Sequence, residues 1–78
     1  MPLVEVTLVE GRSPEQLRRL ITALTDAVEA AVAAARPSIR VVVREVPATH
    51  WAAGDVTVAE RRRAGDVTVA ERRRAGDE

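Results

Sequence analysis

The spacing of apolar residues along the first 46 positions changes from two residues to three or four, and then back to two. Residues 2–9 alternate, and one side of this segment is wholly apolar because it carries Val4, Val6 and Leu8. The other side carries Leu3, Glu5, Thr7 and Val9. A two-residue period of this kind predicts a β-strand with one face turned toward a core.

A long helix is predicted to follow this strand. The sequence "EGRSPEQ" supplies a turn glycine, an N-cap at Ser13, a proline at the first helical position and Gln16 three residues after the cap, which completes a capping box. The apolar stripe that follows contains Leu17, Leu20, Ile21, Leu24, Val28, Ala31, Val32 and Ala35. It predicts a helix of about six turns. The helix should end by Arg36, because Pro37 disfavours helical geometry in the residue before it.

The segment "SIRVVVREV" is predicted to be a second strand, since its residues alternate again. One face carries Ile39, Val41 and Val43, and the other carries Arg40, Val42 and Arg44. Strand, long helix and strand predict a β-α-β unit of the α/β (α+β) class, with parallel strands joined by a right-handed crossover.

A single helix covers only one face of such a strand pair, whereas parallel sheets are normally buried on both faces. The open face is predicted to carry Glu5, Thr7, Arg40 and Arg44 among its valines. We therefore expect this face to meet another subunit through a mixed polar and apolar contact. Its charges should be paired there, because an arginine buried without a partner or a ligand is costly.

The small size of the chain also favours self-association. A chain of 78 residues buries too small a fraction of its surface to be comfortably stable alone. The absence of cysteine excludes disulfides and thiolate metal sites, and His50 is the single histidine, which cannot form a zinc site by itself. Oligomerisation is the remaining source of stability.

Charge and hydropathy exclude two classes of partner. Twelve arginines are balanced by twelve acidic residues, and the zero net charge argues against a nucleic-acid-binding protein. No apolar run approaches the roughly 18 residues that a membrane span needs, and the start lacks the pattern of a signal peptide. We expect a cytoplasmic protein that binds neither nucleic acid nor membrane.

The C-terminal part contains an internal repeat. The sequence "GDVTVAERRRA" occupies residues 54–64 and recurs without a mismatch at 65–75. Each copy is predicted to form a short Val-Thr-Val strand that runs into a polar turn or helix. The arginine triplets do not indicate nucleic-acid binding, because each copy has a net charge of only +1 and no aromatic residue. We predict a domain at residues 1–63 and a mobile duplicated extension at 64–78.

The proline after the initiator methionine has two interpretations. Pro2 fits the first position of a strand, where its missing N–H is tolerated. If Met1 is removed, however, the Pro2 nitrogen becomes a secondary amine. An apolar pocket and nearby guanidinium groups lower the pKa of such an amine and allow it to act as a general base. If Met1 is retained, the nitrogen is an amide and this chemistry is lost.

Several motifs occur together in a recognisable order: Met-Pro at the start, then "LVEGRSPEQ", "IRVVVREV" and "HWAAGDVTVAER". Over residues 1 to about 63, this combination resembles the 4-oxalocrotonate tautomerase family. The resemblance implies that Pro2 is the catalytic base, that Arg12 and Arg40 bind substrate, and that Trp51 is the active-site aromatic. It also implies that the backbone amide at Leu8 helps to orient the substrate.

The same resemblance implies a cofactor-independent, metal-free tautomerase that interconverts enol and keto forms of unsaturated 2-oxo acids or dicarboxylates in aromatic compound degradation. Arg40 would hold the 2-oxo acid end and Arg12 the far carboxylate. Family members are typically hexamers, trimers of dimers, with sites at subunit junctions. Each dimer joins two β-α-β units, each with a short C-terminal hairpin, into a four-stranded sheet with two helices.

Two points bear on what the resemblance implies, the first on the geometry of the hairpin and the second on the activity. The loop after Trp51 departs from the glycine-rich pattern of the family, since Ala52, Ala53 and Asp55 surround Gly54. Retention of Met1 would leave a catalytically inactive oligomer that uses the same arginines to bind a small anionic ligand. This inactive binding protein is the alternative to the enzyme.

Overall fold

A computed structural model describes residues 1–65 of the chain, which divide into two compact units. The first unit, Met1–Glu45, contains β1 (Leu3–Val9), α1 (Pro14–Val32), a short 3-10 helix η1 (Arg36–Ser38) and most of β2 (Arg40–Val46). The second unit begins at Val46. It contains η2 (Ala48–His50), β3 (Ala52–Ala53), β4 (Val56–Thr57) and α2 (Val58–Gly65).

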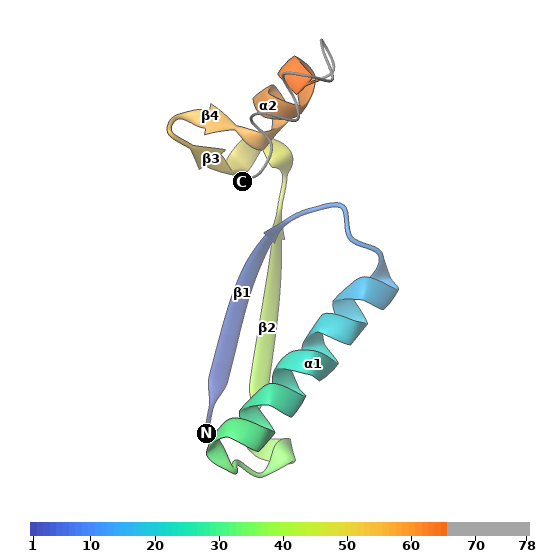
Figure 1. Ribbon diagram of the computed structural model, residues 1–78, viewed down its shortest axis with the longest axis vertical. Coiled ribbons are helices and arrows are strands. Elements are labelled where there is room, and N and C mark those ends of the chain that lie inside the picture. Colours follow the sequence, from blue (N-terminus) through green and yellow to red (C-terminus); the bar gives the residue numbers. More distant parts are fainter. Residues whose placement is uncertain (66–78) are drawn as a thin grey trace. The chain divides into compact units, whose positions relative to one another are not determined.

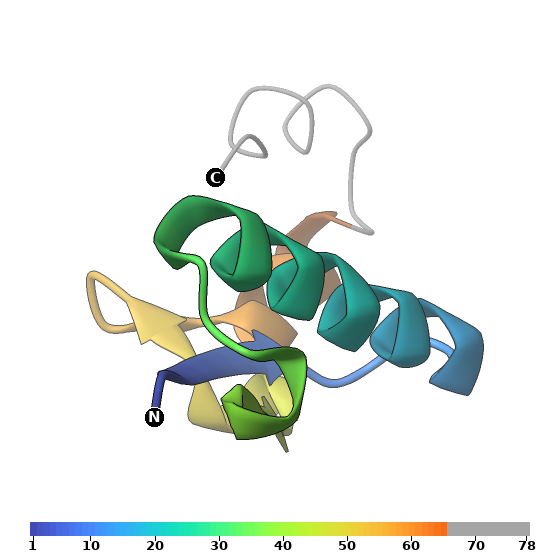
Figure 2. The same cartoon turned by 90° about the horizontal axis from the view of Figure 1, so that it is seen from below.

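The first unit is the predicted β-α-β arrangement. Strands β1 and β2 lie side by side and run in the same direction (Figure 1). Their register is fixed at one end by the backbone N–H of Arg40, which donates to the carbonyl of Pro2 at 2.9 Å. Both views place α1 along one face of the strand pair (Figure 1, Figure 2). The prediction of two parallel strands connected by a helix is confirmed.

The two faces of the strand pair differ in burial as the alternation predicts. Val4, Val6, Leu8, Val41 and Val43 are half-buried, whereas most residues on the other face are exposed, with Val9 an exception at the end of β1. On this open face Leu3 keeps 58% and Val42 keeps 38% of its surface exposed. Among the described residues Ile39 is the one buried hydrophobic side chain. The isolated chain therefore has a thin core, and coverage of the open face by another subunit stays a prediction.

Helix α1 begins with the predicted capping box. The Ser13 hydroxyl accepts a hydrogen bond from the backbone N–H of Gln16 at 3.1 Å, and the Gln16 side chain accepts one from the Ser13 N–H at 2.9 Å. The helix ends at Val32, earlier than the limit that Pro37 sets, and Ala35 lies outside it. The end is set by Ala33, which adopts a left-handed conformation with φ 55° and donates its N–H to the Glu29 carbonyl.

The second unit contains the predicted C-terminal hairpin. Ala52 pairs with Thr57 and Ala53 with Val56 in antiparallel register. The two turn residues between them, Gly54 and Asp55, have φ angles of 59° and 68°. Two consecutive left-handed residues make the turn that suits a two-residue hairpin, so glycine and aspartate at these positions fit the geometry.

Helix α2 has a capping box that the sequence analysis missed. The Thr57 hydroxyl accepts from the Glu60 N–H at 3.0 Å, and the Glu60 carboxylate accepts from the Thr57 N–H at 2.9 Å. The sequence Thr-Val-Ala-Glu carries the signal of this box, although the Val-Thr-Val alternation predicts a strand at Val58. Val58 instead begins the helix, which extends to Gly65.

No helix within residues 1–65 is both long and apolar enough to cross a membrane. The second repeat copy and the predicted mobile extension lie outside the described residues, apart from the two residues that end α2.

Candidate active site

The structure brings two of the predicted site residues together at the N-terminal end of the strand pair. Pro2 immediately precedes β1 and Arg40 opens β2, and the 2.9 Å backbone hydrogen bond joins them directly. This juxtaposition follows from the topology, because the N-terminal ends of adjacent parallel strands meet at the same edge of a sheet. Pro2 is half-buried and Arg40 is exposed.

The Arg40 guanidinium is held by the turn that precedes β2. Its Nη1 donates to the Pro37 carbonyl at 2.8 Å. A guanidinium carries five N–H donors in a planar fork. The contact therefore leaves most of the fork for a carboxylate, which arginine binds through two parallel hydrogen bonds.

Arg12 lies at the opposite end of the strand pair. It follows β1 after Gly11, whose φ of 131° suits glycine, and its Nη1 donates to the Val9 carbonyl at 3.3 Å. The seven residues of β1 span about 20 Å at about 3.3 Å per residue. One chain therefore does not bring Arg12 to Pro2, and the two predicted substrate-binding arginines lie at different ends.

The charges of Arg12 and Arg40 are not paired with carboxylates in the part of the chain that the structure describes. Two other arginines of the same unit do form ion pairs with carboxylates. Arg36 binds two acidic side chains at 2.8 Å each, and Arg44 binds Glu5 at 3.2 Å. Arg44 is thus paired within its own chain, whereas Arg40 contacts a neutral carbonyl, and the pairing of charges across a subunit contact stays a prediction.

The Pro2–Arg40 hydrogen bond indicates which way the Leu8 backbone faces in a regular parallel ladder. The hydrogen bonds of a parallel ladder are evenly spaced, so from the Pro2–Arg40 bond onward, alternate residues of β1 face β2, and Leu8 is in phase with Pro2. Val9 is out of phase, and its carbonyl accordingly accepts the Arg12 side chain. The role of the Leu8 amide stays a prediction, and this register disfavours it because the amide is directed toward β2.

Trp51 belongs to the second unit, at the end of η2, and 39% of its surface is exposed. Its carbonyl accepts the Val58 N–H at 2.9 Å, which fixes the indole-bearing backbone at the base of the hairpin. The neighbouring His50 is exposed and lies 3.3 Å from the Thr49 hydroxyl through Nδ1. The hydrogen bond to Val58 fixes the Trp51 backbone, and the partly exposed indole forms an apolar surface beside the η2 turn.

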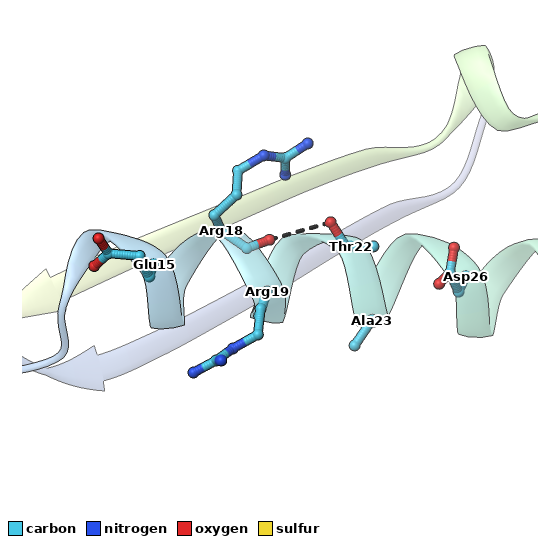
Figure 3. Close-up of a pocket in the computed structure, with 6 residues that line it drawn as sticks. All are labelled: Glu15, Arg18, Arg19, Thr22, Ala23 and Asp26. Atoms are coloured by element: carbon cyan, nitrogen blue, oxygen red, sulfur yellow. Dashed lines mark hydrogen bonds between the residues drawn. The ribbon is translucent and has the colours of Figure 1, made fainter.

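A shallow hollow elsewhere on the molecule does not coincide with the predicted site. It lies on the outer surface of α1 and is lined by Glu15, Arg18, Arg19, Thr22, Ala23 and Asp26 (Figure 3). The side chains of Arg18 and Arg19 extend in opposite directions, and Thr22 donates its hydroxyl to the Arg18 carbonyl at 3.2 Å. All lining residues come from one exposed helix, so the hollow offers no enclosure for a substrate.

Similarity to known proteins covers most of the chain. The sequence model of the family described as tautomerase enzyme matches residues 2–61, a range that begins at Pro2 and includes Arg12, Arg40 and Trp51. A probable tautomerase of Ralstonia nicotianae is 50% identical over 56 residues, which cover 72% of this chain and 80% of that protein. A probable tautomerase of Staphylococcus aureus is 43% identical over 61 residues, covering 78% of this chain and all of that protein.

Solved structures agree with this assignment. A heterohexamer 4-oxalocrotonate tautomerase from Chloroflexus aurantiacus is 42% identical with a TM-score of 0.74, covering 77% of this chain and 97% of that chain. A 4-oxalocrotonate tautomerase homologue in the tomaymycin biosynthetic pathway is 44% identical with a TM-score of 0.78, covering 80% of this chain and 95% of that chain. The resemblance inferred from the sequence motifs is confirmed, and the chain belongs to the tautomerase family.

Proposed function

We propose that the chain is a cofactor-independent keto–enol tautomerase for unsaturated 2-oxo acids or dicarboxylates. The observation that carries this proposal is the junction of Pro2 with Arg40, a cation that has no carboxylate partner among residues 1–65. A general base and an arginine without a carboxylate partner, at the same edge of the sheet, are the groups that an anionic, proton-transferring reaction requires.

The proposed base is the secondary amine that Pro2 gains when Met1 is removed. The half-buried setting of Pro2 favours the neutral amine, and a guanidinium brought close to the nitrogen in the assembled site would favour it further. The amine accepts the proton of the enol hydroxyl, and the electron pair left behind forms the ketone as the double bond shifts. The resulting ammonium returns the proton to a carbon of the conjugated chain, so that the enzyme ends the cycle unchanged.

The arginines hold and polarise the substrate in this proposal. Arg40 binds the carboxylate at the 2-oxo end and stabilises the developing dienolate charge. Arg12 binds the far carboxylate, and Trp51 limits access of water. Since Arg12 lies about 20 Å from Pro2 in one chain, a site that contains both requires Arg12 from another copy. We therefore propose a homohexamer, a trimer of dimers in which each dimer forms a four-stranded sheet.

The test combines mass and activity. Mass spectrometry of the intact chain measures whether Met1 is absent, and native mass measures the oligomer. Wild type and Pro2→Ala are then compared in the ketonisation of 2-hydroxymuconate and of phenylenolpyruvate. We expect kcat to fall by about 10²- to 10⁴-fold, the range of a lost general base, with an unchanged oligomer.

The inactive binding protein is the competing outcome. Arg12 and Arg40 would bind a small dianion whether or not Pro2 is a free amine, because neither is paired with a carboxylate in the described part of the chain. Three results together would support the inactive binding protein over the enzyme. They are a retained Met1, no ketonisation of either acid and measurable binding of a dicarboxylate.

A further inference from the structure

Arg36 stands out among the residues that the proposed reaction does not use. It opens the η1 turn between α1 and β2, and its Nη1 donates to Asp26 Oδ1 and to Glu29 Oε1 at 2.8 Å each. Both acids lie near the C-terminal end of α1, which has no basic residue in its last turn. The hydrogen bond to Asp26, followed in size by that to Glu29, raises the pKa of Arg36. Arg36 and these two acids are called the Arg36 clamp below.

The turn that this clamp ties to α1 also holds the substrate-binding arginine. The residue directly after Arg36 is Pro37, whose carbonyl accepts Nη1 of Arg40 at 2.8 Å. The Arg36 carbonyl accepts the N–H of Ile39, the buried residue that immediately precedes Arg40. A continuous series of contacts therefore runs from the acids of α1, through η1, to the Arg40 guanidinium.

We propose that Arg36, clamped by Asp26 and Glu29, is a positioning residue that fixes the Pro37 carbonyl and thereby presents the Arg40 guanidinium to the substrate carboxylate. Arg36 does not touch the substrate itself. A guanidinium already fixed in place loses less side-chain freedom when the acid binds, which strengthens binding without any new contact. This proposal rests on the proposed function of Arg40.

The main competing explanation is that the turn needs no clamp. Exposed ion pairs contribute little to stability, and all three side chains are about half exposed. Burial of Ile39 and the backbone hydrogen bonds of η1 would then fix the Pro37 carbonyl alone. Under that explanation, removal of Arg36 leaves Arg40 unchanged.

The kinetic test removes the clamp from each side. Arg36→Gln removes the guanidinium, and the double variant Asp26→Asn/Glu29→Gln removes its acceptors while leaving Arg36 in place. The matched control is Arg19→Gln, which makes the same charge change on the outer surface of α1. For 2-hydroxymuconate we expect KM to rise about tenfold in both clamp variants, the size of a weakened charged hydrogen bond. We expect kcat and its pH profile to stay near those of wild type, with Arg36→Lys intermediate and the control unchanged.

A second readout does not depend on activity. Nuclear magnetic resonance of arginine guanidinium groups measures rotation about the Cζ–Nε bond, which hydrogen bonding slows. We expect faster rotation of Arg40 in both clamp variants than in wild type or Arg19→Gln, with circular dichroism confirming that α1 is intact. If Arg36→Gln does not fold, Arg36→Lys and the double variant carry the comparison.

The two proposals fail in different ways. If wild type converts no acid, the proposed function fails, and the resonance measurement alone decides whether Arg36 holds Arg40. Unchanged Arg40 rotation in a folded clamp variant overturns the positioning proposal, as does an unchanged KM in an active one.

Discussion

The two ends of the β1–β2 pair carry different halves of the proposed chemistry. At one end Pro2 and Arg40 are joined by a backbone hydrogen bond, and the Arg40 side chain is anchored on Pro37. At the other end Arg12 follows a glycine turn, and among residues 1–65 its side chain has the Val9 carbonyl as its hydrogen-bond acceptor. In the proposed reaction, one chain therefore supplies the base and Arg40 at one end of the strand pair. Its Arg12, a strand length away, would serve the site of another copy.

The strongest test of this difference compares two matched substitutions. Arg40→Gln removes the cation beside the base and should lower kcat/KM by about 10²-fold, largely through kcat, because dienolate charge develops at this end. Arg12→Gln removes only the far carboxylate contact and should raise KM by about tenfold with a smaller effect on kcat. Steady-state kinetics with a dicarboxylic and a monocarboxylic substrate measure both. Equal effects of the two variants on kcat would contradict the assignment of different roles to the two ends.

The second test asks whether the two ends meet across copies. Pro2→Ala and Arg12→Gln chains are each impaired, but a mixed oligomer contains sites with Pro2 from one parent and Arg12 from the other. If each site takes these residues from different chains, random mixing restores about one quarter of the wild-type sites. Co-refolding of the two variants followed by activity measurement gives the recovery. Each variant refolded alone is the control, and recovery no greater than the average of the two would show that the site does not combine two chains.

The third test concerns the N-terminal cap of α1, which lies next to Arg12. Ser13 directly follows Arg12, and its hydroxyl caps the helix through Gln16. Ser13→Ala should lower the free energy of unfolding by about 1 kcal/mol, as measured by urea denaturation. KM should rise less than in Arg12→Gln, since the charge is retained. A KM as high as that of Arg12→Gln would mean that the cap, rather than the charge, sets substrate affinity.

Local patterns predicted the parts of the fold that local physics controls. The alternation of residues 2–9 and the capping box at Ser13 each depend on neighbours in sequence, and both are present as predicted. The end of α1 was not predictable in the same way, because no residue type marks Ala33 as left-handed. Since Ala33 ends the helix early, Arg36 falls in the η1 turn, where it binds Asp26 and Glu29.

The sequence pattern predicts part of the arrangement of the candidate residues, but not the finer contacts. The meeting of Pro2 with Arg40 and the separation of Arg12 follow from parallel topology and strand length, which the sequence pattern already implied. The direction of the Leu8 backbone depends on the register, which only the structure supplies. Sequence order also gives no sign that Pro37 would hold Arg40, because that contact depends on the path of the turn.

The smallest expected effect lies outside both ends, at the cap of α2. The Thr57 N–H and then the Thr57 side chain hydrogen-bond to Glu60 and lower the pKa of that carboxyl below its ordinary value of 4.5. A carboxyl with a lowered pKa stabilises the folded state above its ordinary pKa, and this contribution is lost as the pH falls through the folded value. We therefore expect the Thr57 amide resonance to shift on acidification below about pH 4.5 in wild type but not in Glu60→Gln.

At neutral pH Glu60→Gln should keep its tautomerase activity, because glutamine still accepts the Thr57 N–H. A large loss of activity would show that the cap of α2 matters to the reaction as much as either end of the strand pair.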